Sequence, residues 1–289
     1  VGEFLNSGFE FALSYKELGK AFQYSITGTL STLHNEVISL KNNPNGIISW
    51  LTTTEVGSPI GTFYLIEADG IFQNNDEILN HTTDVEGTTV VVQPKAKPGD
   101  VRYIDFNKDG FINNDDRQLM GNPFPKIQYG LNFTASYKIV DCALFFYGVS
   151  GNHLYDVPLF WLERTDDNDN YTKDLNPWTP ENPSTTTPRP VFGSAGANNN
   201  IQNSNRWLEK GDYLKLKTLE LGFTLPETLS KKANISKMRI YLSGHNLFTL
   251  TKYKGLDPEV TNGNIRMRGV DDGSYPNVRS ITAGVQLKF

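Results

Sequence analysis

The sequence of 289 residues predicts an all-β fold, an antiparallel transmembrane β-barrel segment with long extracellular loops. The first observation is the last segment, 279–289, in which apolar and polar residues alternate up to the final position. The second is that the same alternation recurs in several earlier segments of strand length. The third is that long polar stretches separate some of these segments, whereas short turns separate others.

The last segment shows the pattern most clearly. Its apolar face consists of Ile281, Ala283, Val285, Leu287 and Phe289. Its other face carries serine, threonine, glycine, glutamine and lysine. Soluble domains usually lose order at their ends, but a tilted strand of about 9–11 residues also spans a bilayer. We therefore expect this segment to be the closing strand of a membrane β-barrel.

Two hairpins are expected earlier in the chain. Segments 9–16 and 22–31 alternate cleanly and are joined by the tight turn 17–20. Segment 127–137 alternates in the same way, and a short turn leads from it into a strand at 142–149.

Two more strands are expected at 213–225 and 237–250. In the first of these, the apolar phase switches between Leu216 and Leu219, which predicts a β-bulge or a lumen-facing kink. With the last segment, the chain would contain roughly seven or eight strands of barrel type.

The polar stretches are too long for ordinary connections in a compact soluble domain. They lie at 33–58, 70–100, 151–205 and 252–277. On a barrel such stretches are extracellular loops, and the acidic run 166–170 is expected to be a solvated part of one. The apolar faces of 127–137 and 281–289 carry no charge, which favours contact with lipid.

Composition excludes several classes of protein. No run of about 18 apolar residues exists, so a helical membrane protein is excluded. The net charge of −5, with no long basic run, makes nucleic acid an unsuitable partner. The single cysteine, Cys142, excludes an internal disulfide and is expected to be buried or lipid-facing. No signal peptide precedes Gly2, so we expect a C-terminal part of a longer protein.

One motif has the spacing of a calcium-binding loop. Counting from Asp105, oxygen-bearing side chains fall at positions 1, 3 and 5 (Asp105, Asn107 and Asp109), and glycine falls at position 6. The Phe111 carbonyl is expected at position 7 and Asp116 at position 12. We therefore predict a structural Ca²⁺ site that stiffens an extracellular segment. The alternative is a metal-free turn built by Asx side chains and glycine.

No catalytic constellation is present in the sequence. The four histidines are scattered, with neither a metalloprotease motif nor a nucleophile elbow, so we expect no enzymatic activity. Aromatic residues in the loops admit two interpretations, as platforms for sugar rings or as loop cores and interface anchors. These residues are Tyr155, Trp161, Tyr171, Trp178 and Trp207. The second interpretation is favoured for each of them taken singly.

Several longer blocks occur in a fixed order. They are Gly57–Tyr64, Asp69–Gln73, Pro98–Arg117, Gly121–Asn132, Phe145–Asn152, Trp178–Pro183, Tyr213–Lys217, Ser243–Phe248 and Tyr253–Glu259. In their residues and in their order along the chain, these blocks resemble the C-terminal part of the SusC/RagA-type TonB-dependent outer-membrane transporters. The resemblance covers essentially the whole chain.

This resemblance implies that residues 1–289 are the C-terminal part of a large barrel whose plug domain and N-terminal strands lie outside this sequence. It implies a location in the outer membrane of a Gram-negative bacterium, in contact with outer-membrane lipids. The expected partners are a SusD-like surface lipoprotein and the TonB complex, and the expected substrates are glycans or oligopeptides. The row from Ile281 to Phe289 would then be the signal that the outer-membrane assembly machinery recognises.

A second hypothesis from the same residues is a soluble, β-rich module that binds calcium and serves in carbohydrate binding or adhesion. A soluble sandwich also alternates polar and apolar residues along its strands. Its wet face usually carries Lys and Glu, whereas here the polar faces carry mostly Ser, Thr, Asn, Gln and Gly.

Overall fold

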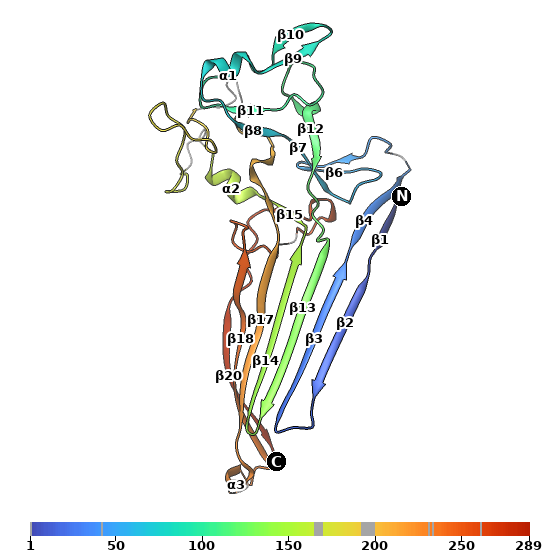
Figure 1. The fold of residues 1–289 in the computed structure, drawn as a ribbon, viewed down its shortest axis with the longest axis vertical. Helices are drawn as coiled ribbons and strands as arrows, with labels where there is room; N and C mark the ends of the chain where they lie inside the picture. The colour runs from blue at the N-terminus through green and yellow to red at the C-terminus, as the bar shows by residue number, and fades with distance from the viewer. Residues whose placement is uncertain are drawn as a thin grey trace.

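The computed structural model describes residues 2–289 apart from 42, 165–169, 192–199, 231, 233 and 261. Four residues of the acidic run 166–170 therefore lie outside the described part. The described residues form one long sheet, which we call the wall sheet, and a layer of short strands and helices at one end of it, which we call the loop layer (Figure 1). No helix among the described residues has both the length and the apolar character needed to cross a membrane.

The wall sheet has the order β2-β3-β13-β14-β17-β18-β20, and each neighbouring pair is antiparallel. Its strands are β2 (Glu10–Glu17), β3 (Phe22–Thr32), β13 (Ile127–Tyr137), β14 (Val140–Ser150), β17 (Tyr213–Thr224), β18 (Lys237–Thr251) and β20 (Ser280–Lys288). The predicted all-β, antiparallel barrel segment is confirmed. In the described residues β2 and β20 are the two edges of this sheet.

Short connections lie at the end of the wall sheet that is remote from the loop layer (Figure 1). Lys138 and Ile139 form a two-residue turn between β13 and β14, with Lys138 at a φ of 54°. β14 therefore begins at Val140, slightly earlier than predicted. The β2–β3 hairpin closes at the same end, between Glu17 and Phe22. Short turns at one end and long loops at the other are typical of outer-membrane barrels.

One face of the wall sheet is apolar from strand to strand. A single row across five strands holds Gly28, Leu131, Phe146, Leu216 and Phe248. The rings of Phe146 and Phe248 lie 6.2 Å apart. Because side chains alternate along a strand, the other face receives the polar residues of every strand.

Aromatic side chains gather toward the short turns on this apolar face. Phe22, Tyr137 and Phe223 lie in one row across β3, β13, β14 and β17. Outer-membrane barrels carry such aromatic girdles at the level of the membrane interface. The apolar face therefore has the composition of a lipid-facing surface, and the polar face that of a barrel lumen.

β17 contains the predicted bulge. Its register with β14 shifts between Leu216 and Thr218, so Lys217 is the extra residue against β14. Against β18, two residues, Asn246 and Leu247, stand opposite Lys217. The neighbouring strand β18 is also irregular here, with Asn246 at a φ of 50°. The bulge restores both Leu216 and Leu219 to the apolar face, which explains the switch of phase in the sequence.

The loop layer consists of short elements. Its strands are β1 (Gly2–Ser7), β4 (His34–Leu40), β5 (Ile47–Ile48), β6 (Thr52–Thr54), β7 (Thr62–Ile66), β8 (Ala68–Ile71), β9 (Thr82–Val85), β10 (Thr88–Val91), β11 (Val101–Tyr103), β12 (Arg117–Met120), β15 (His153–Asp156), β16 (Leu208–Lys210) and β19 (Val270–Asp271). Its helices are α1 (Asn75–Leu79), α2 (Val157–Leu162), η1 (Asn114–Asp116), η2 (Asn205–Trp207) and η4 (Ile265–Met267), whereas α3 (Glu227–Ser230) lies between β17 and β18.

The loop layer has a hydrophobic core of its own. Trp207 and Tyr155 are fully buried there, with ring centroids 6.4 Å apart, and Phe160 lies 4.7 Å from Trp207. Leu51, Phe63, Leu65, Val157 and Val270 complete the cluster. Three distant loops therefore fold together instead of extending separately into solvent.

Candidate functional site

Loop 105–116 connects β11 to β12 within the loop layer and ends in η1. Gly110 adopts a φ of 90°, a left-handed conformation that glycine takes without strain. Ile112, at position 8 of the loop, packs against the buried cluster of Ile66, Val101 and Tyr103. The local fold therefore has the sharp turn that the motif predicts, and Ile112 anchors the loop to an apolar cluster.

Asp116 closes the base of this loop. Its side chain is fully buried, and Oδ1 accepts the backbone N–H of Phe106 at 2.9 Å. Oδ2 accepts the backbone N–H of Asn113 at 2.7 Å. Burial raises the pKa of Asp116 above its ordinary value, while these backbone donors act in the opposite direction.

Asp105 lies at the other end of the loop and is 91% buried, as only 9% of its surface is exposed. Its Oδ2 accepts the Gly110 N–H at 3.0 Å. Its Oδ1 is buried and has no hydrogen-bond partner in the part of the chain that the structure describes. A buried carboxylate oxygen without a partner is costly, and a bound cation would satisfy it.

Asp109 and Asn107 are held together between these two ends. The Asn107 amide donates to Asp109 Oδ2 at 2.9 Å, and the Phe111 N–H donates to Asp109 Oδ1 at 2.9 Å. These donors, the Asn107 amide foremost, lower the pKa of Asp109. The loop therefore keeps this carboxylate ionised.

The predicted metal-site residues thus fall in one compact loop, and their oxygen chemistry suits a hard cation. Among the described residues, however, no three His, Cys, Asp or Glu side chains form a group placed to hold a metal. A cation here would need the Asn107 amide oxygen and the Phe111 carbonyl beside the carboxylates. Asp116 is the least available donor, because its oxygens already accept backbone N–H groups.

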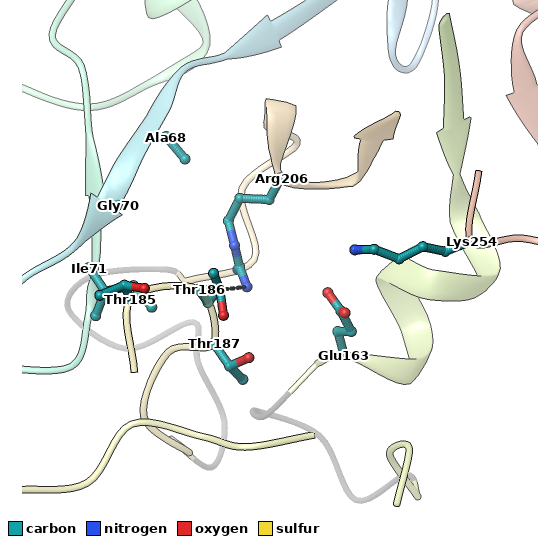
Figure 2. Close-up of a pocket in the computed structure, with 9 residues that line it drawn as sticks. All are labelled: Ala68, Gly70, Ile71, Glu163, Thr185, Thr186, Thr187, Arg206 and Lys254. Carbon is teal, nitrogen blue, oxygen red and sulfur yellow. Dashed lines mark hydrogen bonds between the residues drawn. The ribbon is translucent and has the colours of Figure 1, made fainter. Parts of the chain in front are cut away.

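A separate polar cavity of about 360 Å³ lies elsewhere in the loop layer (Figure 2). Ala68, Gly70, Ile71, Glu163, Thr185, Thr186, Thr187, Arg206 and Lys254 line it. The charged ends of Glu163, Arg206 and Lys254 turn toward this space (Figure 2). The Arg206 guanidinium donates to the Thr186 carbonyl at 3.3 Å. Burial lowers the pKa of Arg206 below its ordinary value. The lining residues are far apart in the sequence, so no local motif marks this cavity.

The polar face of the wall sheet also carries a charged cluster that the sequence did not reveal. Arg239 of β18 donates from Nη2 to Glu220 Oε1 at 2.7 Å, and from Nε to Asp141 Oδ1 at 3.0 Å. A second contact joins its Nη2 to Asp141 Oδ2. The three residues come from adjacent strands, β14, β17 and β18, and only the register brings them together.

The loop aromatics divide into two groups. Tyr155, Trp178 and Trp207 are buried, so they form loop cores as the favoured interpretation holds. Trp161 and Tyr171 are about half exposed, and the Arg164 guanidinium lies 4.7 Å from the Trp161 ring. Cys142 lies on the apolar face of β14, opposite Ala135 and Leu221, where a lipid-facing thiol is expected.

The predicted assembly-signal residues lie along the last strand, and Phe289 directly follows its end. Ile281, Ala283, Val285 and Leu287 share the apolar face of β20, which pairs with β18, and Phe289 is 85% exposed. The geometry places the row where lipid would be. Recognition by assembly machinery stays a prediction.

Known proteins are similar to this chain in both sequence and architecture. No family model matches the chain. It is 32% identical to TonB-dependent receptor P3 of Formosa agariphila, in an alignment that spans all of this chain and 29% of the receptor. It is 29% identical to TonB-dependent receptor P26 of the same bacterium and 22% identical to TonB-dependent receptor SusC of Bacteroides thetaiotaomicron, again over its whole length. The chain spans under a third of the length of each of these relatives.

Solved structures agree in fold. The RagAB peptide transporter superposes on the whole chain with a TM-score of 0.76 at 23% identity, over 30% of the transporter chain. A second structure, the RagAB peptide importer in its open-open state, gives 0.76 at 24% identity. The fold is thus that of a TonB-dependent receptor barrel. The chain is a segment of a SusC/RagA-type TonB-dependent transporter.

Proposed function

We propose that this chain forms part of the barrel wall and of the extracellular face of an outer-membrane nutrient importer. The observation that carries the proposal is the seven-stranded wall sheet, whose apolar face, uncharged along β13 and β20, suits lipid and whose opposite face suits a hydrated lumen. The likeness to TonB-dependent receptors over the whole chain supports it.

The proposal extends to the partners of such an importer. Uptake would depend on the TonB complex, with a SusD-like lipoprotein at the surface, and the solutes would be glycans or oligopeptides. The names of relatives support this range, since SusC and the RagAB peptide transporter are among the proteins that the chain resembles. Within it, the described residues supply wall, loops and partner surface, with no catalytic group required.

Fractionation tests the membrane part of this proposal. The intact protein should sediment with outer membranes and require detergent to stay monodisperse. If it were monodisperse in plain buffer and stayed in the aqueous phase, the soluble calcium-binding module would be the better interpretation. A growth assay tests the transport part of the proposal. If the protein is an importer, deletion of its gene should abolish growth on one class of glycan or peptide and leave growth on the corresponding monomers unchanged.

We further propose that loop 105–116 binds Ca²⁺ and that the ion stiffens the loop layer. The buried, unpartnered Oδ1 of Asp105 and the glycine turn support this. Limited proteolysis of the intact protein with Ca²⁺ and with a chelator tests it. We expect Ca²⁺ to protect this loop, and Asp105→Asn to abolish the protection.

Asp115→Asn is the matched control for this experiment. Asp115 is an exposed neighbour that lies outside the predicted ligand positions, so its variant should keep the response to Ca²⁺. Identical protection of the unsubstituted protein with and without Ca²⁺ would refute the metal site.

A further inference from the structure

The segment that joins β18 to β20 folds over the polar face of the wall sheet. We call residues 252–279 the strap, and of these only residue 261 lies outside the described part. A cavity of about 220 Å³ separates the strap from the wall. Its wall side includes Gln128, Tyr147 and Tyr213, and its strap side includes Pro258 and Arg268.

The register shows that the strap covers the lumen side and not the lipid side. Gln128 pairs with Val149, and Val149 pairs with Tyr213, so these residues share one face of β13, β14 and β17. The lipid-facing row that contains Leu131 and Phe146 alternates with them and lies on the opposite face. The strap therefore enters the barrel mouth at its extracellular end.

Lys215 attaches the strap to the wall. Its side chain is only 2% exposed, and Nζ lies 2.5 Å from Asp257 Oδ1 and 2.9 Å from Glu259 Oε2. Asn277, near the other end of the strap, donates its side-chain amide to Asp257 Oδ2 at 3.0 Å. The buried Lys215 ammonium thus binds the carboxylates of Asp257 and Glu259, and these carboxylates also accept hydrogen bonds from Asn277 near the C-terminal end of the strap.

The bulge in β17 adds a second cation to this attachment. Lys217, the extra residue of the bulge, places Nζ 2.7 Å from Glu259 Oε2 and 2.8 Å from Oε1. Lys217 is more exposed than Lys215 and reaches only Glu259 among the described carboxylates. Lys215 is therefore the central group, and Lys217 is a natural comparison for it.

The far part of the strap is fixed to other elements of the loop layer. β19 pairs in parallel with β15, and the Thr52 hydroxyl of β6 donates to the Arg266 carbonyl at 2.7 Å. Tyr253, just after β18, donates its hydroxyl to Asp271 Oδ2 at 2.7 Å. The strap is attached at several separated points, so it is a fixed crosspiece and not a freely moving loop.

We propose that the strap sets the size limit for solutes entering the lumen, and that Lys215 is the residue that positions it. The inference rests on the proposed function, because it requires a solute path through the barrel. Its energetic basis is the burial of Lys215. Without this cation, the partly buried Asp257 carboxylate loses its ammonium partner, whereas Glu259 keeps only Lys217. Repulsion between the two carboxylates then favours release from the wall of the part of the strap around Asp257 and Glu259.

The test measures access beneath the strap in living cells that carry the intact transporter. Cys142 and any cysteine in the rest of the intact transporter are replaced by serine, and Gln128→Cys then places a single thiol on the lumen face under the strap. Cells are treated with a small, membrane-impermeant maleimide or with a maleimide on a bulky polyethylene glycol chain. We expect the unsubstituted strap to admit the small reagent and exclude the bulky one.

In the Lys215→Met variant, labelling by the bulky reagent should accelerate at least about tenfold, since removing one partner of a buried ion pair costs more than the 1.4 kcal/mol that a factor of ten represents. Lys215→Arg should restore exclusion, because it keeps the cation. Lys217→Met should have a much smaller effect. A merely structural role would change labelling by both reagents equally, whatever their size.

A second thiol separates failure of this inference from failure of the proposed function. Tyr275, in the strap, is 87% exposed, so Tyr275→Cys should react with both reagents from outside the cell. If Tyr275→Cys is unreactive in intact cells, the outer-membrane orientation is wrong. If it reacts, and Gln128→Cys reacts equally fast with the bulky reagent whether residue 215 is Lys or Met, the size-limiting strap is refuted.

Discussion

Leu131→Arg should destabilise the transporter, whereas Asn132→Arg should not. Both residues lie near the middle of β13, but Leu131 is on the apolar face and Asn132 on the polar face. β13 has 11 residues. At about 3.4 Å per residue and a tilt of about 40°, this strand rises roughly 28 Å, close to the ~25 Å apolar band of outer-membrane barrels.

Leu131 therefore lies close to the bilayer midplane, where a lipid-facing arginine costs about 2–4 kcal/mol. This corresponds to a loss of about 30- to 900-fold in the folding constant. Ile127→Arg, at the extracellular end of the same face, should cost about 0–1 kcal/mol because it approaches the interface. The cost should thus depend on both face and depth.

Urea titration of the intact transporter in lipid vesicles, followed by tryptophan fluorescence, measures these differences. Equal costs for Leu131→Arg and Asn132→Arg would refute the assignment of the two faces. Equal costs for Leu131→Arg and Ile127→Arg would refute the assignment of depth.

Three further predictions concern the loop layer. Asp116→Ala leaves the N–H groups of Phe106 and Asn113 without their acceptor, at about 1–3 kcal/mol each, and hydrogen exchange at these two amides should accelerate accordingly. Trp207→Ala removes a fully buried ring and should cost the loop layer about 3–5 kcal/mol, seen as protease cleavage within it while the wall sheet stays protected. Burial, with help from nearby carboxylates, raises the pKa of Asp156 to about 6 from an ordinary value of 3.8. The folded state therefore binds this proton more tightly than the unfolded state, so stability of the loop layer should fall as pH rises from about 4 to 6. Asp156→Asn should remove that dependence in melting curves, and a stability that rises through this window would contradict the assignment.

The wall sheet could be predicted from the sequence, because a strand with one face in lipid and one in water must alternate apolar and polar residues. The period of two fixes which residues share a face, and even the bulge of β17 is visible as a change of phase between Leu216 and Leu219. The calcium-type loop was equally visible, because its residues are consecutive and Gly110 is required by the turn.

The loop layer and the lumen contacts were not accessible in this way. Trp207 meets Tyr155 and Phe160 across long stretches of chain, and no period connects them. Arg239 and Asp141 face each other only through the register of β14, β17 and β18. Lys215 looked like an ordinary polar residue of a strand, and its role depends on a strap that follows some 40 residues later.

A measurement of which side chains of β13 face lipid and which face the lumen tests the central claim most directly. Nitroxide labels are placed singly at residues 127–137 of the intact transporter in lipid vesicles, with Cys142 replaced by serine, and their collision rates with oxygen and with a polar nickel complex are compared. We expect oxygen access to peak at the odd-numbered residues, with the highest values around Leu131, and to fall at the even-numbered ones. A flat profile, or peaks at the even-numbered residues, would contradict a barrel wall with its apolar face in the membrane.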